Sequence, residues 1–84
     1  MLARSKAGHD KDEVFVVTGE STDRVALADG KGRTLERPKM KNRLHVQLIR
    51  HLPEETLTQL EGIRKDEDVR RILKAYSDRN RAGQ

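Results

Sequence analysis

Basic side chains are concentrated in one stretch of this 84-residue chain. Between residues 31 and 50, seven residues are Lys or Arg and only Glu36 is acidic, so the stretch carries a net charge of +6. The whole chain carries +4, so the remaining residues sum to −2. Charge placed in this way indicates a phosphate-bearing partner, either nucleic acid or an anionic membrane surface. A membrane-binding helix is disfavoured, because Pro38 interrupts the densest basic run.

A second basic segment surrounds Gly8. Lys6 and Lys11 flank this glycine, which predicts a bend in residues 6–12. Backbone amides at a glycine bend can bind phosphate oxygens. An ordinary hairpin loop explains the same residues equally well.

Other chemistry has little support in the sequence. The three histidines, His9, His45 and His51, are too scattered to indicate a metal site, and we expect no cofactor. We find no pattern of nucleophile, base and acid, so we expect no enzymatic activity and no small-molecule substrate. The absence of cysteine excludes disulfides and cysteine-ligated zinc and is consistent with the cytosol. No apolar run approaches the length of a membrane span.

The elements that would position the basic residues are short strands. Apolar alternation and turn residues predict five of them, over residues 1–5, 13–18, 24–28, 33–36 and 44–49. The Asp29-Gly30 pair predicts a tight turn that folds residues 24–28 onto 33–36. Five short strands within about fifty residues indicate a small closed or nearly closed barrel. We expect a mainly β barrel domain over residues 1–51 and a helical extension over residues 52–84.

Two helices are predicted in the extension. The first begins near Pro53 and ends at Gly62, and the second begins with Asp66 as its N-cap. The second helix has one apolar stripe, which we expect to dock on the barrel or on a partner: Val69, Ile72, Leu73 and Tyr76. Residues 77–84 contain no apolar residue except Ala82, so we expect them to fray.

The expected core is apolar and small. It contains Val14, Val16, Val25, Leu27, Leu35, Val46 and Leu48. Phe15 and Val17 compete with Val14 and Val16 for the inward face, and the sequence does not decide between them.

The chain resembles the small bacterial KOW-domain RNA-binding proteins, which are similar to the KOW class of large-subunit ribosomal proteins. The resemblance covers roughly residues 1–50 and rests on residues 5–11, the strand at 14–17, the Asp29-Gly30 turn and the Pro-Lys-Met-Lys-Asn sequence at 38–42. It implies an SH3-like barrel that binds RNA, most naturally ribosomal RNA, in the cytoplasm and in association with the large ribosomal subunit and translation. Asp12 stands where the family commonly has a glycine, and Asp adopts left-handed backbone less readily than Gly. The shape of that loop is therefore left open.

Charge and resemblance together predict one RNA-binding surface. The expected contact residues are Lys6, Gly8, Lys11, Lys31, Arg33, Arg37, Lys39, Lys41, Asn42, Arg43 and His45. We expect the cations of residues 31–43 to be exposed and unpaired, so that replacing Lys39 and Lys41 by Glu weakens RNA binding and leaves the fold intact. A protein-interaction module is the alternative, because SH3-like barrels also hold peptides.

Overall fold

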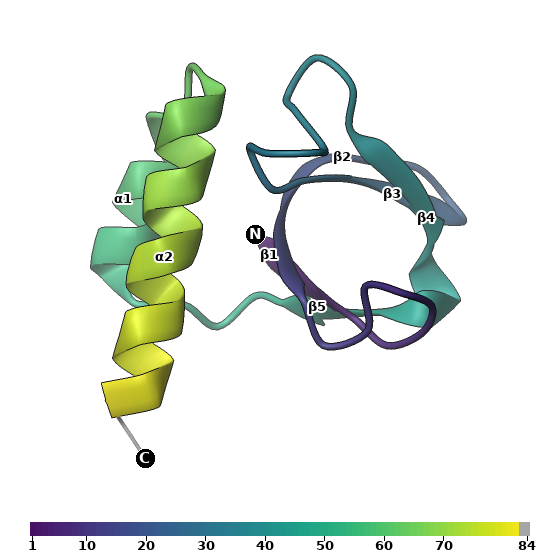
Figure 1. Cartoon of the computed structure of the whole chain (residues 1–84), viewed down its shortest axis with the longest axis horizontal. Helices are drawn as coiled ribbons and strands as arrows, with labels where there is room; N and C mark the ends of the chain where they lie inside the picture. Colours follow the sequence, from purple (N-terminus) through teal and green to yellow (C-terminus); the bar gives the residue numbers. More distant parts are fainter. Residues whose placement is uncertain (83–84) are drawn as a thin grey trace.

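The strands form one antiparallel sheet. The computed structural model describes the backbone of residues 1–82 and the side chains of residues 1–79. Its strands are β1 (Leu2–Ser5), β2 (Val14–Glu20), β3 (Arg24–Ala28), β4 (Lys39–Asn42) and β5 (Val46–Ile49). They pair in the order β4-β3-β2-β1-β5 (Figure 1). The chain is thus a small mixed α/β fold with a five-stranded sheet and two helices.

The sheet curls strongly but stays open (Figure 1). Its two edge strands, β4 and β5, follow each other in the chain and are joined by the 3-10 turn η1 (Arg43–His45). Backbone hydrogen bonds hold this turn, from Arg43 N to Asp23 O at 2.9 Å and from Lys6 N to His45 O at 2.8 Å. Among the described strands, no pairing joins β4 to β5, so the sheet is not a closed barrel.

The fourth strand lies later in the chain than the sequence predicts. Residues 33–36 form bends, and the strand that pairs with β3 is Lys39–Asn42, with Leu27 opposite Lys39. The prediction failed because the Asp29 carboxylate accepts hydrogen bonds from Lys31 N at 2.8 Å and Arg33 N at 2.9 Å, which closes the backbone into a turn. The predicted last strand is also shorter, because its first residues lie in η1.

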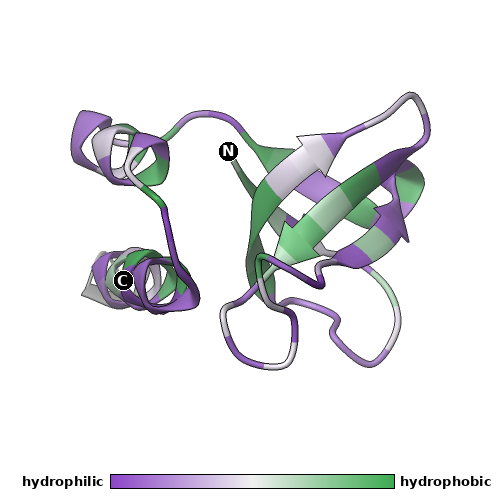
Figure 2. Cartoon of the chain, turned by 90° about the horizontal axis from the view of Figure 1, so that it is seen from above, coloured by the Kyte–Doolittle hydropathy of each residue, from purple (hydrophilic) through white to green (hydrophobic). Residues whose placement is uncertain are grey.

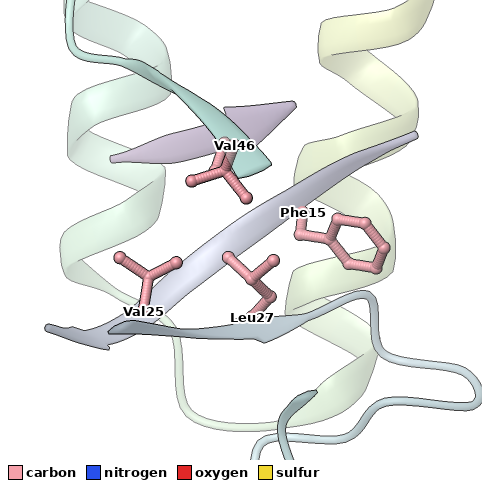
Figure 3. Packing of buried hydrophobic residues seen from close by; sticks show 5 residues of the cluster. Phe15, Val25, Leu27 and Val46 are labelled. Carbon is pink, nitrogen blue, oxygen red and sulfur yellow. The ribbon is translucent and has the colours of Figure 1, made fainter. Parts of the chain in front are cut away.

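The inside of the curled sheet holds the first hydrophobic cluster. Phe15, Val25, Leu27 and Val46 point toward one another from three strands (Figure 3). Ala3 completes the buried set, and Val17 and Leu48 pack against it. Phe15 and Val17 therefore take the inward face that the sequence could not assign.

The outer face of the sheet holds a second cluster beneath two helices. α1 (Glu54–Glu61) and α2 (Asp66–Ala82) lie together on one side of the sheet (Figures 1 and 2). Leu2, Val16 and Val69 are its buried residues, and Val14, Leu35, Leu73 and Tyr76 are among those packed against them. Val14, Val16 and Leu35 therefore belong to this second cluster and not to the cluster inside the curled sheet. Figure 2 shows the hydrophobic colouring mainly on strands and helix faces, whereas the loops are hydrophilic.

The ends of α1 agree with the prediction, whereas the N-terminal end of α2 differs from it in the residue that binds the backbone amides. Pro53 precedes α1 and Gly62 follows it, as predicted. At α2, Asp68 rather than Asp66 binds the free backbone amides, since its Oδ2 accepts hydrogen bonds from Arg64 N and Lys65 N, both at 3.1 Å. These two bonds lower the pKa of Asp68 below its ordinary value.

The apolar stripe of α2 is docked on the sheet. Val69 and Ile72 are buried, and Leu73 and Tyr76 are half-buried. The second cluster thus crosses the predicted boundary between residues 51 and 52, and the helical extension shares a core with the sheet. α2 is helical through Ala82, while residues 83 and 84 of the predicted frayed tail lie outside the described residues.

Neither helix within residues 1–82 has the length and apolar character needed to cross a bilayer.

Candidate nucleic-acid interface

The Gly8 loop links β1 to β2 and has two residues in left-handed backbone conformation. Gly8 has a φ of 90° and Asp12 a φ of 73°. The loop is closed by hydrogen bonds from Asp12 N to Ser5 O at 2.8 Å and from Lys11 N to Gly8 O at 3.2 Å. Asp12 therefore adopts the conformation that a glycine would favour, and Lys6 and Lys11 remain exposed on either side of the bend.

Asp10 is the centre of an ion network beneath this loop. Its Oδ1 lies 2.7 Å from Lys41 Nζ and its Oδ2 lies 2.6 Å from Lys39 Nζ. Lys41 Nζ also donates hydrogen bonds to Ser5 Oγ and Ala7 O, both at 2.7 Å. The ammonium of Lys41 thus has three protein acceptors, and its side chain is only 10% exposed. The network ties the Gly8 loop to edge strand β4.

The electrostatics of the network favour the ionised form of Asp10. Hydrogen bonds from Lys39 and then Lys41 hold the pKa of this carboxyl far below its ordinary value, and the Ser5 hydroxyl, which donates to Oδ1 at 2.7 Å, acts in the same direction. Burial raises the pKa of Asp10, with an effect smaller than that of either lysine hydrogen bond but larger than that of the Ser5 bond. One carboxylate facing two ammonium groups leaves a local charge of +1, which suits an anionic partner at the half-exposed Lys39.

The expectation of unpaired cations is wrong for three of the predicted contact residues. Lys39 and Lys41 pair with Asp10, and Arg43 Nη1 lies 3.1 Å from Glu20 Oε2. The sequence does not reveal these pairs, because the acids come from other elements that are distant along the chain. Replacing Lys39 and Lys41 by Glu would place three carboxylates together, so this change is not expected to leave the fold intact.

Two other predicted contact residues have structural partners around η1. The Asn42 side-chain oxygen accepts a hydrogen bond from Leu44 N at 2.8 Å and caps the turn. His45 is exposed, and its backbone carbonyl receives the Lys6 amide. Both residues therefore lie at η1, where they shape the turn between β4 and β5.

The remaining predicted cations lie on the segment between β3 and β4, residues 29–38, which we call the basic loop. Lys31, Arg33 and Arg37 are exposed. Within residues 1–79, none of the three forms a side-chain ion pair with an acidic residue. Their charges are therefore available to a partner from solution.

Backbone hydrogen bonds shape the basic loop before any partner binds. The Asp29 turn fixes its first half, where Asp29 N and Gly30 N both donate to Arg33 O at 2.8 and 3.0 Å. In its second half, Arg37 N donates to Thr34 Oγ1 at 3.1 Å. Such a loop loses less conformational entropy on binding than a flexible one.

Helix α2 contacts the basic loop through two hydrogen bonds. Asp66 Oδ1 accepts a hydrogen bond from Leu35 N at 2.8 Å, and the Arg70 guanidinium donates to Gly30 O. Gly30 has a φ of 77°, and a Cβ added there would lie 2.6 Å from Asp66 O. The sequence pattern predicts Asp66 only as a helix cap and predicts no role for Arg70. No signal in the sequence connects either residue to a segment more than thirty positions away.

The arrangement brings eight of the eleven predicted residues into two groups, while Asn42, Arg43 and His45 lie at η1. Lys6, Gly8, Lys11, Lys39 and Lys41 surround Asp10 or flank its loop, while Lys31, Arg33 and Arg37 lie on the basic loop. The side chains described contain no cluster of three or more His, Cys, Asp or Glu residues that could hold a metal ion. Comparison of the chain with protein-family models and with curated proteins finds no match.

Proposed function

We propose that the protein is a non-catalytic RNA-binding module that contacts the phosphate backbone through its basic loop. The observation that carries the proposal is the loop's construction: three exposed cations free of acidic partners in the described structure, on a backbone fixed by Asp29 and by α2. Phosphate oxygens are suitable partners for such a surface, because Lys and Arg neutralise them and release condensed counterions.

The fold part of the proposal is an SH3-like barrel of the KOW kind. It is supported by the strand order, by the η1 turn that joins the edge strands, and by an inner cluster enclosed by the curled sheet. The Gly8 loop and the Pro38–Asn42 sequence carry the resemblance to KOW proteins. By that resemblance the partner is ribosomal RNA, and the place of action is the large ribosomal subunit in the cytoplasm.

The structure changes which residues we assign to the contact. Lys31, Arg33 and Arg37 form its main part, with Lys6 and Lys11 as a second edge. Three further cations lie next to this contact and are paired with acids: Lys39, Lys41 and Arg43. They add to the positive electrostatic potential of the surface, because two of them share the single carboxylate of Asp10. Gly8, Asn42 and His45 shape the adjoining turns.

The test compares charge reversals that leave the ion network untouched. The Arg33→Glu and Arg37→Glu double variant should weaken binding to a short single-stranded RNA and reduce the log–log salt slope by about 1.4, at about 0.7 per phosphate contact. The control carries the same charge change at Arg79 and Arg81. Arg79 lies 13 residues after Asp66, which is about 20 Å along α2 at 1.5 Å per residue. Equal losses in both variants, or a slope that does not change, would refute the assignment.

The second candidate is a protein-interaction module, and one observation favours it. Met40 and Leu44 are 53% and 80% exposed at edge strand β4 and the η1 turn. An exposed edge with apolar side chains can pair with a strand of a partner protein. Met40→Lys should abolish the capture of such a partner and leave RNA binding unchanged or slightly stronger.

A further inference from the structure

Beside the basic loop lies a cleft of about 1070 Å³. It runs between the middle of α2, the start of β2 and the Asp29 turn, with Tyr76, Leu73 and Val14 among its lining residues. Its size is that of a small-molecule site. Arg4 of β1 and the end of the Gly8 loop also line it. The second hydrophobic cluster and the Arg70–Gly30 hydrogen bond hold α2 against the sheet and the Asp29 turn.

The charges around this cleft cancel. Its cations are Arg4, Lys31, Arg70 and Lys74. Its acids are Asp12, Glu13, Asp29 and Asp78. A free phosphate or a polyphosphate gains little net attraction here, whereas a neutral ligand finds both donors and acceptors. The cleft therefore differs in chemistry from the basic loop at its rim.

Tyr76 gives the cleft an aromatic surface. It is half-buried, packs against the second cluster and also lines the cleft. It is the only tyrosine in the chain, which has no tryptophan, and the single phenylalanine, Phe15, is 2% exposed inside the sheet. Of the aromatic rings of Phe, Tyr and Trp within residues 1–79, only that of Tyr76 can thus stack on a ligand.

We propose that the cleft binds one unstacked nucleobase of the RNA, stacked on Tyr76, while the flanking phosphates lie on the basic loop. This inference rests on the proposed RNA-binding function and gives it a base-binding site. Lys31 joins the two parts, since it belongs to the basic loop and also lines the cleft. Recognition of single-stranded RNA by stacking on aromatic side chains is frequent, because every base has a π face.

The acids of the cleft explain how a base would be held at its edge. Carboxylates accept hydrogen bonds from the exocyclic amines of adenine, cytosine and guanine, and cations donate to ring nitrogens and carbonyl oxygens. Asp29 already accepts hydrogen bonds from two backbone amides. The other acids of the cleft are exposed, and their carboxylates can accept hydrogen bonds from a base: Asp12, Glu13 and Asp78. A base with an exocyclic amine is therefore preferred over uracil.

The experiment uses Tyr76 as its own reporter. Incorporation of 3-fluorotyrosine gives a single ¹⁹F resonance, because the chain has one tyrosine. We expect this resonance to shift when the intact protein binds a short single-stranded RNA that contains adenine. It should not shift with an abasic oligonucleotide of equal length and charge, although that oligonucleotide still binds with a salt-dependent affinity.

Two variants separate stacking from packing. Tyr76→Leu should lower RNA affinity by about 5- to 150-fold, the loss that removal of one stacked base implies. Tyr76→Phe keeps the ring and should retain the affinity, and circular dichroism checks the fold of both. The ¹⁹F measurement needs no substitution, so the inference remains testable even if Tyr76→Leu does not fold.

The possible results distinguish two failures. If RNA binds with the expected salt dependence but the ¹⁹F resonance does not move, the base-binding site is refuted and the proposed function stands. If the abasic oligonucleotide shifts the resonance as much as RNA does, a general conformational change is the cause, and the base site is also refuted. If RNA does not bind even at low salt, both proposals are wrong.

Discussion

Lys41 Nζ lies 2.7 Å from Asp10 Oδ1, although the two residues are 31 positions apart in the sequence. This contact joins the loop between β1 and β2 to edge strand β4. Because β4 and β5 do not pair in the described structure, this ion network is one of the interactions that hold the two ends of the curled sheet in place. Lys39 and Lys41 are therefore paired with Asp10 and are less available for RNA contacts than unpaired lysines would be.

Removal of Asp10 should destabilise the protein. The Asp10→Ala variant leaves two ammonium groups close together without their shared carboxylate, and we expect a loss of about 3 kcal/mol in the free energy of unfolding. Urea denaturation followed by circular dichroism measures this loss. Asp23→Ala is the control, because its side chain is exposed at the β2–β3 turn. Equal effects of the two substitutions would show that the network contributes nothing to stability.

Asp10 should also make stability depend on acidity. Its pKa is depressed in the folded protein from an ordinary value of 3.8, so its contribution is fully present above that pH and is lost as the pH falls toward the folded pKa. Asp68 contributes in the same direction. The free energy of unfolding should therefore decrease below about pH 4, and Asp10→Asn should flatten this decrease. A wild-type and an Asp10→Asn curve with the same acid slope would contradict the assignment.

Gly30 is expected to be required for docking of the basic loop on α2. In Gly30→Ala the new Cβ would lie 2.6 Å from Asp66 O, at a backbone φ of 77° that disfavours side chains. The backbone conformation alone costs about 1–2 kcal/mol, and the clash adds to this. The melting temperature and the amide exchange of Leu35 report the effect. Gly32→Ala is the matched control, since a Cβ at Gly32 meets no atom within 4 Å.

The helices and the sheet should unfold as one unit. Val69 is fully buried against Leu2 and Val16, so Val69→Ala should lower the free energy of unfolding by about 2 kcal/mol. It should shift the unfolding of strand and helix amides together in hydrogen exchange. Leu57→Ala, at a 42% exposed position on α1, should have a small effect. Loss of protection in α2 alone would show that the helical extension docks only weakly.

Local sequence signals located most of the elements. The short β-branched and aromatic run from Val14 to Val17, the Pro53 start and Gly62 end of the first helix, and the apolar stripe from Val69 to Tyr76 all have counterparts in the structure. These signals work because they depend on neighbours within a few residues. The strand at residues 33–36 failed, because the Asp29 side chain and α2 together bind the backbone amides that a strand would have used.

The sequence by itself determined the placement of positive charge in residues 31–50, four of the five strands, the two helices and a bend at Gly8. Only the tertiary structure decided which cations are free. The sequence contains the acids Asp10 and Glu20, but whether they neutralise a lysine or an arginine depends on strand order and loop direction. In the same way, both faces of β2 contribute to hydrophobic clusters, because α2 covers the face opposite the inside of the curled sheet. Coulomb attraction and hydrophobic burial act through distances in space, and distances between remote segments exist only once the chain is folded.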